Sequence, residues 1–144
     1  MSHVVSIRFQ DDQMKRLRRL ARRLGRTPSE TSALLVEESL REAEFGHIDF
    51  RDSGEGRQAY VKASSLAVWE VVRLARSYHM DVTKTAQHLK WLPLRVQAAL
   101  NYAKAYPEEI EAVIEDAAVK SDFQILSRML PQAEEWVLES DLGE

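Results

Sequence analysis

The chain has 144 residues, a length that allows one domain or two small ones. Its residues are 44% hydrophobic and 30% charged, with no cysteine, which excludes wholly disordered chains, disulfide-stabilised folds, thiolate zinc sites and cysteine nucleophiles. No apolar run approaches the roughly 18 residues of a membrane span, and the amino terminus lacks the layout of a signal peptide. We therefore expect a cytoplasmic protein with no membrane partner.

The formal net charge of −3 conceals segments of opposite sign. Residues 1–26 carry eight basic and two acidic side chains, whereas residues 105–144 carry two basic and eleven acidic ones. This distribution favours a polyanion as partner of the amino-terminal segment and a basic partner for the carboxy-terminal segment. The alternative is that both segments are simply solvated faces.

Residues 4–10 alternate between two faces, as in a strand. The apolar face consists of Val5, Ile7 and Phe9, and the other face of Val4, Ser6, Arg8 and Gln10. An amphipathic helix follows, with Asp11-Asp12 as its cap and Gly25 at its end. The run Thr27-Pro28-Ser29-Glu30 then predicts the start of a second helix, which should reach about Phe45.

A single unit of this kind is too small to form a core, and its strand has two open edges. A second copy would remedy both, because two strands can pair into an antiparallel ribbon over which four helices close. The dimer core predicted in this way consists of Val5, Ile7, Phe9, Leu34 and Leu35.

The segment SIRFQDDQMKRLRRLARRLGRTPSE resembles the ribbon-helix-helix family of Arc, MetJ and CopG, although Gln10 stands where proline is common. The resemblance implies a dimer whose ribbon enters the major groove of double-stranded DNA. Base edges would then face Val4, Ser6 and Arg8. Phosphates would be held by Arg26 and by the amino end of the second helix, at Thr27 and Ser29.

Residues 47–116 predict a short β-hairpin followed by a helical domain. Turn residues at 52–56 separate two short strands, although the stretch 47–63 could also be an extended linker between two units. Helices are expected over 66–78, 82–89 and 93–106. The last two have the spacing of a helix-turn-helix. Its exposed turn, around Trp91, Leu92 and Leu94, is apolar, which favours packing or dimerisation over contact with DNA.

Residues 48–116 resemble a small domain of prokaryotic, VapB-like antitoxins. The marks of this resemblance are Gly56-Arg57, Val68-Trp69-Glu70 and the run from Val96 through Tyr102 to Pro107-Glu108-Glu109-Ile110. In such antitoxins the usual partner is a PIN-type or PIN-like ribonuclease toxin, so the resemblance implies that partner here.

No pattern predicts catalysis, a cofactor or a metal site. The four histidines are 44, 32 and 9 positions apart, so none forms a ligand pair on one helical turn. The sequence also lacks a glycine-rich phosphate loop and a nucleophile elbow. We therefore expect a protein that is not an enzyme.

Residues 117–144 predict an acidic tail of short amphipathic helices. Its proposed toxin-binding anchors are Phe123, Leu126, Met129, Leu130 and Trp136. The alternative is that these helices fold back onto the middle domain.

These features predict a mainly helical protein with a ribbon-helix-helix domain at 1–46, a helical domain at 47–116 and a partner-binding tail at 117–144. The expected function is that of an antitoxin of a type II toxin–antitoxin system, which binds its own operator as a homodimer or higher homo-oligomer and neutralises a toxin. A free-standing transcriptional regulator and a scaffold protein that binds no DNA are the alternatives.

Overall fold

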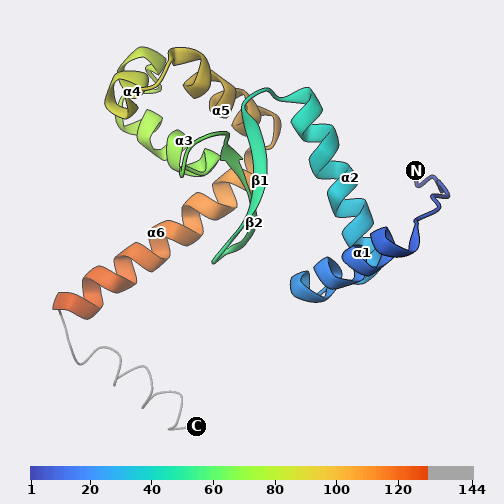
Figure 1. Ribbon diagram of the computed structural model, residues 1–144. Helices are drawn as coiled ribbons and strands as arrows, with labels where there is room; N and C mark the ends of the chain where they lie inside the picture. Colours follow the sequence, from blue (N-terminus) through green and yellow to red (C-terminus); the bar gives the residue numbers. More distant parts are fainter. Residues whose placement is uncertain (130–144) are drawn as a thin grey trace, which may run out of the picture.

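A computed structural model describes residues 1–129 of the chain (Figure 1). Within this range the protein is mainly helical, with six helices and one two-stranded antiparallel sheet. The elements are α1 (Asp11–Leu24), α2 (Pro28–Glu44), β1 (Ile48–Ser53), β2 (Gly56–Val61), α3 (Val68–Ser77), α4 (Val82–Leu89), α5 (Pro93–Ala105) and α6 (Pro107–Met129).

The ends of α1 and α2 follow local capping chemistry. Gln10, and not the expected Asp11-Asp12 pair, precedes α1, and its N–H donates to Gln13 Oε1 at 3.0 Å. Gly25 ends α1 in the left-handed conformation, with φ of 66°, as predicted. Thr27 caps α2 by accepting the Glu30 N–H at 3.1 Å, also as predicted.

Residues 1–10 form an extended arm that carries no strand in the single chain. The sheet of the described range contains β1 and β2 alone, because the arm has no neighbouring strand in one copy. The predicted ribbon requires a second copy, and it stays a prediction.

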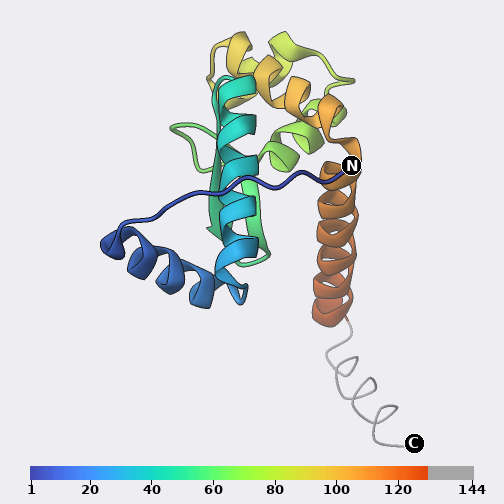
Figure 2. The same ribbon diagram turned by 90° about the vertical axis from the view of Figure 1, so that its right-hand side faces the viewer.

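The hairpin confirms the strands expected on either side of the 52–56 turn. Ile48 pairs with Val61 and Ser53 with Gly56, so the register is regular along the whole ladder. Gly56 has φ of 102°, a backbone conformation that side chains with a Cβ rarely adopt. The hairpin lies between α2 and the helical unit of α3, α4 and α5 (Figures 1 and 2).

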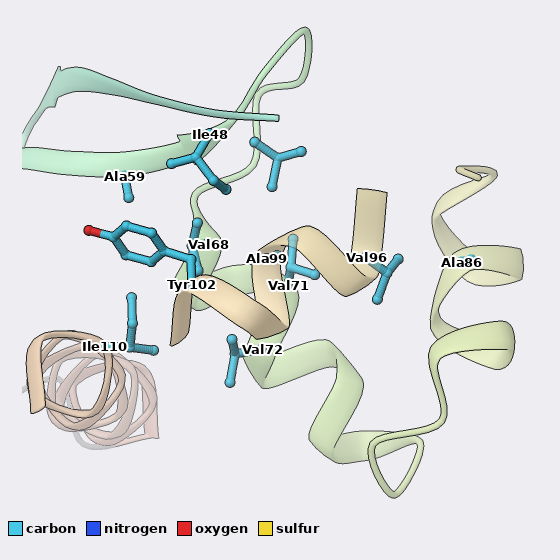
Figure 3. Packing of buried hydrophobic residues seen from close by; sticks show 11 residues of the cluster. Ile48, Ala59, Val68, Val71, Val72, Ala86, Val96, Ala99, Tyr102 and Ile110 are labelled. Atoms are coloured by element: carbon cyan, nitrogen blue, oxygen red, sulfur yellow. The ribbon is translucent and has the colours of Figure 1, made fainter. Parts of the chain in front are cut away.

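The main core lies where the hairpin meets α3 and α5 (Figure 3). Its largest fully buried side chain is that of Tyr102, which lies in the same cluster as Ile48 and Ala59 of the hairpin. By contrast, the buried side chains of α1 and α2 are limited to Ala21, Thr31 and Glu38. The amino-terminal segment therefore has almost no core of its own within one copy.

Helix α6 runs without a break from Pro107 to Met129 and so crosses the predicted domain boundary at 116. The expected short tail helix is thus the second half of a helix of 23 residues. Of the predicted anchors, Leu130 and Trp136 lie outside the described residues. No helix in the described range is both long enough and apolar enough to cross a membrane.

Candidate nucleic-acid interface

Helix α1 and the residues on either side of it carry basic side chains, most of which have no carboxylate partner within the described residues. Within residues 1–129, Arg16 pairs weakly with Asp12 at 3.8 Å, and Arg23 pairs with Asp52 at 3.3 Å. The other basic side chains of this segment lie more than 4.0 Å from every described carboxylate oxygen; they are Arg8, Lys15, Arg18, Arg19, Arg22 and Arg26. Unpaired cations on one short segment form a surface suited to a polyanion.

The predicted base-contacting residues lie on the arm and are exposed. Val4 has a relative exposure of 94%, and Ser6 and Arg8 are exposed as well. The structure thus leaves these side chains accessible, and their alternation with apolar residues follows from the sequence.

The predicted phosphate contacts at the start of α2 are also exposed, at Arg26, Thr27 and Ser29. The Thr27 hydroxyl already accepts the Glu30 N–H, and the Thr31 N–H donates to the Thr27 carbonyl at 2.9 Å. Pro28 has no N–H to offer. A phosphate at this helix end would therefore rely on the Ser29 N–H and hydroxyl together with Arg26.

The apolar side of the arm lies beside a hollow between α1 and α2. Phe9 lines this hollow with Leu17, Leu20 and Leu35, and Val5 and Ile7 are 79% and 61% exposed. Of the predicted dimer-core residues, Leu34 differs, because it lines a separate hollow on the hairpin side of α2. The structure therefore groups Leu35 with Phe9, and it adds Leu17 and Leu20 to the candidate dimer surface.

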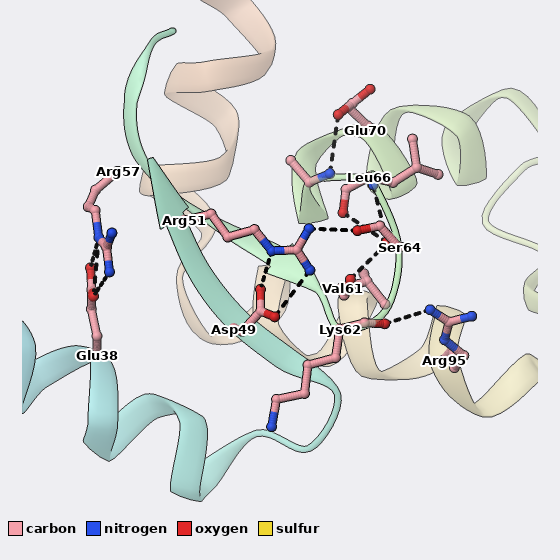
Figure 4. Close-up of polar contacts among 11 residues, drawn as sticks. Glu38, Asp49, Arg51, Arg57, Val61, Lys62, Ser64, Leu66, Glu70 and Arg95 are labelled. Atoms are coloured by element: carbon pink, nitrogen blue, oxygen red, sulfur yellow. Dashed lines mark hydrogen bonds and ion pairs between the residues drawn. The ribbon is translucent and has the colours of Figure 1, made fainter. Parts of the chain in front are cut away.

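Two ion-pair clusters attach α2 to the rest of the protein, and sequence analysis missed both. In the first, Arg57 of β2 binds the buried Glu38 carboxylate with Nη2–Oε1 at 2.7 Å and Nε–Oε2 at 3.0 Å (Figure 4). Arg57 also donates to Asp52 at 3.0 Å. The hydrogen bonds that Arg57 donates to Glu38 are the largest cause of its raised pKa. This contact fixes α2 against the hairpin.

The second cluster joins α2 to α5 and α6. Arg41 donates to the Tyr102 hydroxyl at 2.7 Å and to Glu109 at 2.9 Å, and its guanidinium lies 3.7 Å from the Tyr106 ring centroid. The Tyr102 hydroxyl in turn donates to Glu109 at 2.7 Å. Burial, followed by the hydrogen bond to Glu109, raises the pKa of Tyr102 above its ordinary value of 10.0. Gly56-Arg57 and Tyr102 were the sequence signals nearest to these contacts.

The second half of α6 presents an apolar stripe. Phe123, Leu126 and Met129 have relative exposures of 46%, 47% and 74%, and Val119 lies one turn before Phe123 at 68%. Earlier in the helix, Lys120 forms an ion pair with Glu55 of the hairpin turn. The first part of the predicted tail thus packs near the hairpin, whereas the anchors that the structure describes remain exposed.

The described residues hold no group of three His, Asp or Glu side chains arranged for a metal ion. No family model matches the chain, and neither a curated protein nor a solved structure does so.

Proposed function

We propose that the protein is a dimeric, sequence-specific DNA-binding protein that represses its own operator and acts as the antitoxin of a ribonuclease toxin. The observation that carries the DNA-binding part is the exposed arm beside unpaired cations. Val5, Ile7 and Phe9 alternate with Val4, Ser6 and Arg8 along an arm that has no partner strand in one copy.

Dimerisation would bury the apolar side of this arm and would at the same time give its backbone N–H and C=O groups hydrogen-bond partners. A lone extended segment exposes unpaired N–H and C=O groups, which a second strand can pair. Phe9 of one copy already lies at the hollow that Leu17, Leu20 and Leu35 line. A ribbon formed in this way would leave the Ser6 and Arg8 side chains directed together toward the groove.

The antitoxin part is supported by the exposed stripe of α6 and by the acidic charge of residues 105–144. Phe123, Leu126 and Met129 offer apolar anchors, which dominate the energetics of protein interfaces. The surrounding carboxylates would steer a basic partner, and a ribonuclease is basic where it binds its polyanionic substrate. The partner class itself comes from the resemblance to antitoxins of residues 48–116.

The DNA-binding proposal is tested by a gel shift with duplex DNA from the chain's own promoter. Arg8→Ala should leave the helical circular dichroism unchanged and remove about 1–3 kcal/mol of discrimination between operator and random duplex. Lys15→Ala is the matched control, since loss of a phosphate contact should weaken both duplexes equally. Unchanged operator affinity of the Arg8 variant would contradict the proposal.

The antitoxin proposal is tested separately, by coexpression with the product of the neighbouring gene. We expect that product to be toxic alone, and to copurify with the chain and be silenced by it. A chain that shifts its promoter fragment but has no toxic neighbour would be a free-standing regulator.

A further inference from the structure

A hollow of about 320 Å³ lies between the carboxy end of α2 and helix α5, on the side of the protein away from the start of α2. Its apolar lining includes Phe45, Leu94 and Ala98, and its acidic lining residue is Glu44. Leu94 is 64% exposed, and Leu92, two residues before it, is 72% exposed. Two large exposed leucines beside a hollow mark a surface suited to an apolar side chain of a partner.

Basic side chains border this hollow. The Lys62 N–H donates to the His47 carbonyl at 2.7 Å, which places Lys62 next to a lining residue. The Arg95 guanidinium donates to the Lys62 carbonyl at 2.6 Å (Figure 4). It also lies 4.3 Å from the Trp91 ring centroid. A guanidinium held on two sides loses little further freedom when it binds a carboxylate.

These cations are not neutralised by the described part of the chain. Lys62 and Arg95 form no ion pair within 4.0 Å there, whereas the arginines of the neighbouring hairpin, Arg51 and Arg57, are both paired. The hollow therefore has a largely apolar lining with one carboxylate, Glu44, and unpaired positive charge at its border, on Lys62 and Arg95. Its complement is an acidic segment that carries large apolar side chains.

Residues 130–144 have this composition. They contain five carboxylate side chains and no Lys or Arg, together with Leu130, Trp136, Val137, Leu138 and Leu142. We propose that this acidic segment of one copy binds the α2–α5 hollow of another copy, with an apolar side chain in the hollow and carboxylates against Lys62 and Arg95. The contact requires neither a toxin nor the arm that would bind DNA, but it uses Leu130 and Trp136, which are also predicted toxin-binding anchors.

The contact is expected between copies and not within one. Trp136 follows Met129 by seven residues, which can span at most about 25 Å. Helix α6, with its 23 residues, is about 34 Å long, and it leads away from the hollow in both views (Figures 1 and 2). We therefore expect the apolar group at 136–138 to meet the hollow of another copy.

Nucleic acid is the main competing occupant of a basic surface. Phosphates would use Lys62 and Arg95, but they would leave Leu92 and Leu94 exposed. An acidic segment with apolar anchors covers both kinds of side chain, and for this reason we favour it.

The test uses a fluorescein-labelled peptide with the sequence of residues 130–144, titrated with the full chain and followed by anisotropy. We expect binding that weakens as salt rises, as charge pairing at a surface requires. Leu94→Asp and the double variant Lys62→Glu/Arg95→Glu should each weaken binding at least ten-fold. Leu94 lies in the first turn of α5, where an acidic side chain suits the helix dipole, so this variant should keep its circular dichroism.

The matched control is Lys84→Glu/Lys104→Glu, which makes the same change of charge on α4 and α5 at exposed residues outside the hollow. It should bind the peptide like the unchanged chain, and a scrambled peptide of equal charge should bind at least ten-fold more weakly. Equal binding of the scrambled peptide, or an equal loss in the control, would overturn the proposal. The proposal would also be overturned if Leu94→Asp and Lys62→Glu/Arg95→Glu bound the peptide normally but lost affinity for random duplex DNA.

Discussion

At the scale of single residues, the arginines divide into two groups with different tasks. Arg41 and Arg57 are largely buried by their partners and bind carboxylates on other elements. The arginines of α1 other than Arg16 and Arg23 have no such partners within the described residues. A buried, multiply bonded guanidinium contributes to the position of an element, whereas an unpaired exposed one remains available to a ligand.

Arg57→Gln should destabilise the protein by about 3 kcal/mol or more. The substitution leaves the Glu38 carboxylate buried, at 6% exposure, without its charged partner, and removal of one member of a buried pair is far costlier than loss of an exposed pair. Urea unfolding followed by circular dichroism measures the change.

Arg23→Gln is the control for this variant, because its ion pair with Asp52 is exposed and should contribute at most about 1 kcal/mol. The double variant Glu38→Met/Arg57→Met should recover most of the stability by removing both charges. A double variant as unstable as Arg57→Gln would show that the guanidinium acts through packing and not through charge.

Tyr102 should make the protein sensitive to alkaline pH. Its folded pKa is raised, so above about pH 10 the unfolded state loses the phenolic proton while the folded state keeps it. The free energy of unfolding should then fall as pH rises from about 10 toward the folded pKa, by up to about 1.4 kcal/mol per pH unit.

Tyr102→Phe should be less stable than the unchanged chain at neutral pH, because Arg41 and Glu109 lose hydrogen bonds. Its stability should nevertheless depend less on pH between about 10 and 12. Tyr60→Phe, on the hairpin outside this cluster, is the control and should keep the pH dependence of the unchanged chain. If the free energy of unfolding of Tyr102→Phe fell with pH as steeply as that of the unchanged chain, the alkaline sensitivity would not come from Tyr102.

At the scale of elements, the sequence predicted the helix ends and the hairpin, because these features are decided by residues close together in the chain. Gly25, Thr27, Asp81 and Pro93 each mark a helix end in the structure, because capping is decided within a few residues. The hairpin was predicted for the same reason, since its turn residues lie together in the sequence.

Contacts between residues far apart in the sequence, and the full length of α6, were not predictable. The Arg57–Glu38 and Arg41–Tyr102 contacts join positions 19 and 61 residues apart, and no local spacing indicates them. The unbroken α6 was missed because its surroundings change along its length: Ile110 is buried, whereas Phe123 and Met129 are exposed. The change in composition at residue 116 thus follows the last contact of the helix with the main core, at Ile114, and does not mark the end of the helix. The partner strand proposed for the arm would belong to a second copy, so neither the sequence nor a single copy shows it.

The arm should be the element on which dimerisation depends. Phe9 is 44% exposed and lines the hollow with Leu17, Leu20 and Leu35, so a carboxylate there would face an apolar surface in the dimer. Phe9→Asp should therefore give monomers in sedimentation and abolish the operator shift at the same time.

Gln13→Asp is the control for Phe9→Asp, since it adds one carboxylate to the edge of the same hollow without removing an apolar group. It should retain the dimer. A monomeric unchanged chain that still shifts its operator would contradict an obligate dimer.

At the scale of the whole molecule, the two candidate interaction surfaces lie on opposite sides of the hairpin. In Figure 1 the arm and α1 are on one side and the end of α6 is on the other. In Figure 2 α1 and the end of α6 are again on opposite sides, and the arm crosses in front of α2. The ion-pair clusters of Arg57 and Arg41 hold α2 to the hairpin and to α6 between them. This arrangement allows DNA and a protein partner to bind the same copy without sharing residues.

The two activities should accordingly be separable by substitution. Phe123→Asp/Leu126→Asp places charges on the exposed stripe of α6, where neither side chain belongs to the core. This variant should keep its circular dichroism and its operator shift, but it should neither copurify with the neighbouring toxin nor silence it. Ser121→Asp/Gln124→Asp adds the same charges at exposed polar positions of the same helix and should still silence the toxin.

Arg8→Ala should show the reverse behaviour, with toxin binding retained and operator discrimination lost. If the stripe variant still silences the toxin, the neutralising surface lies elsewhere, and the apolar end of α6 has a different partner.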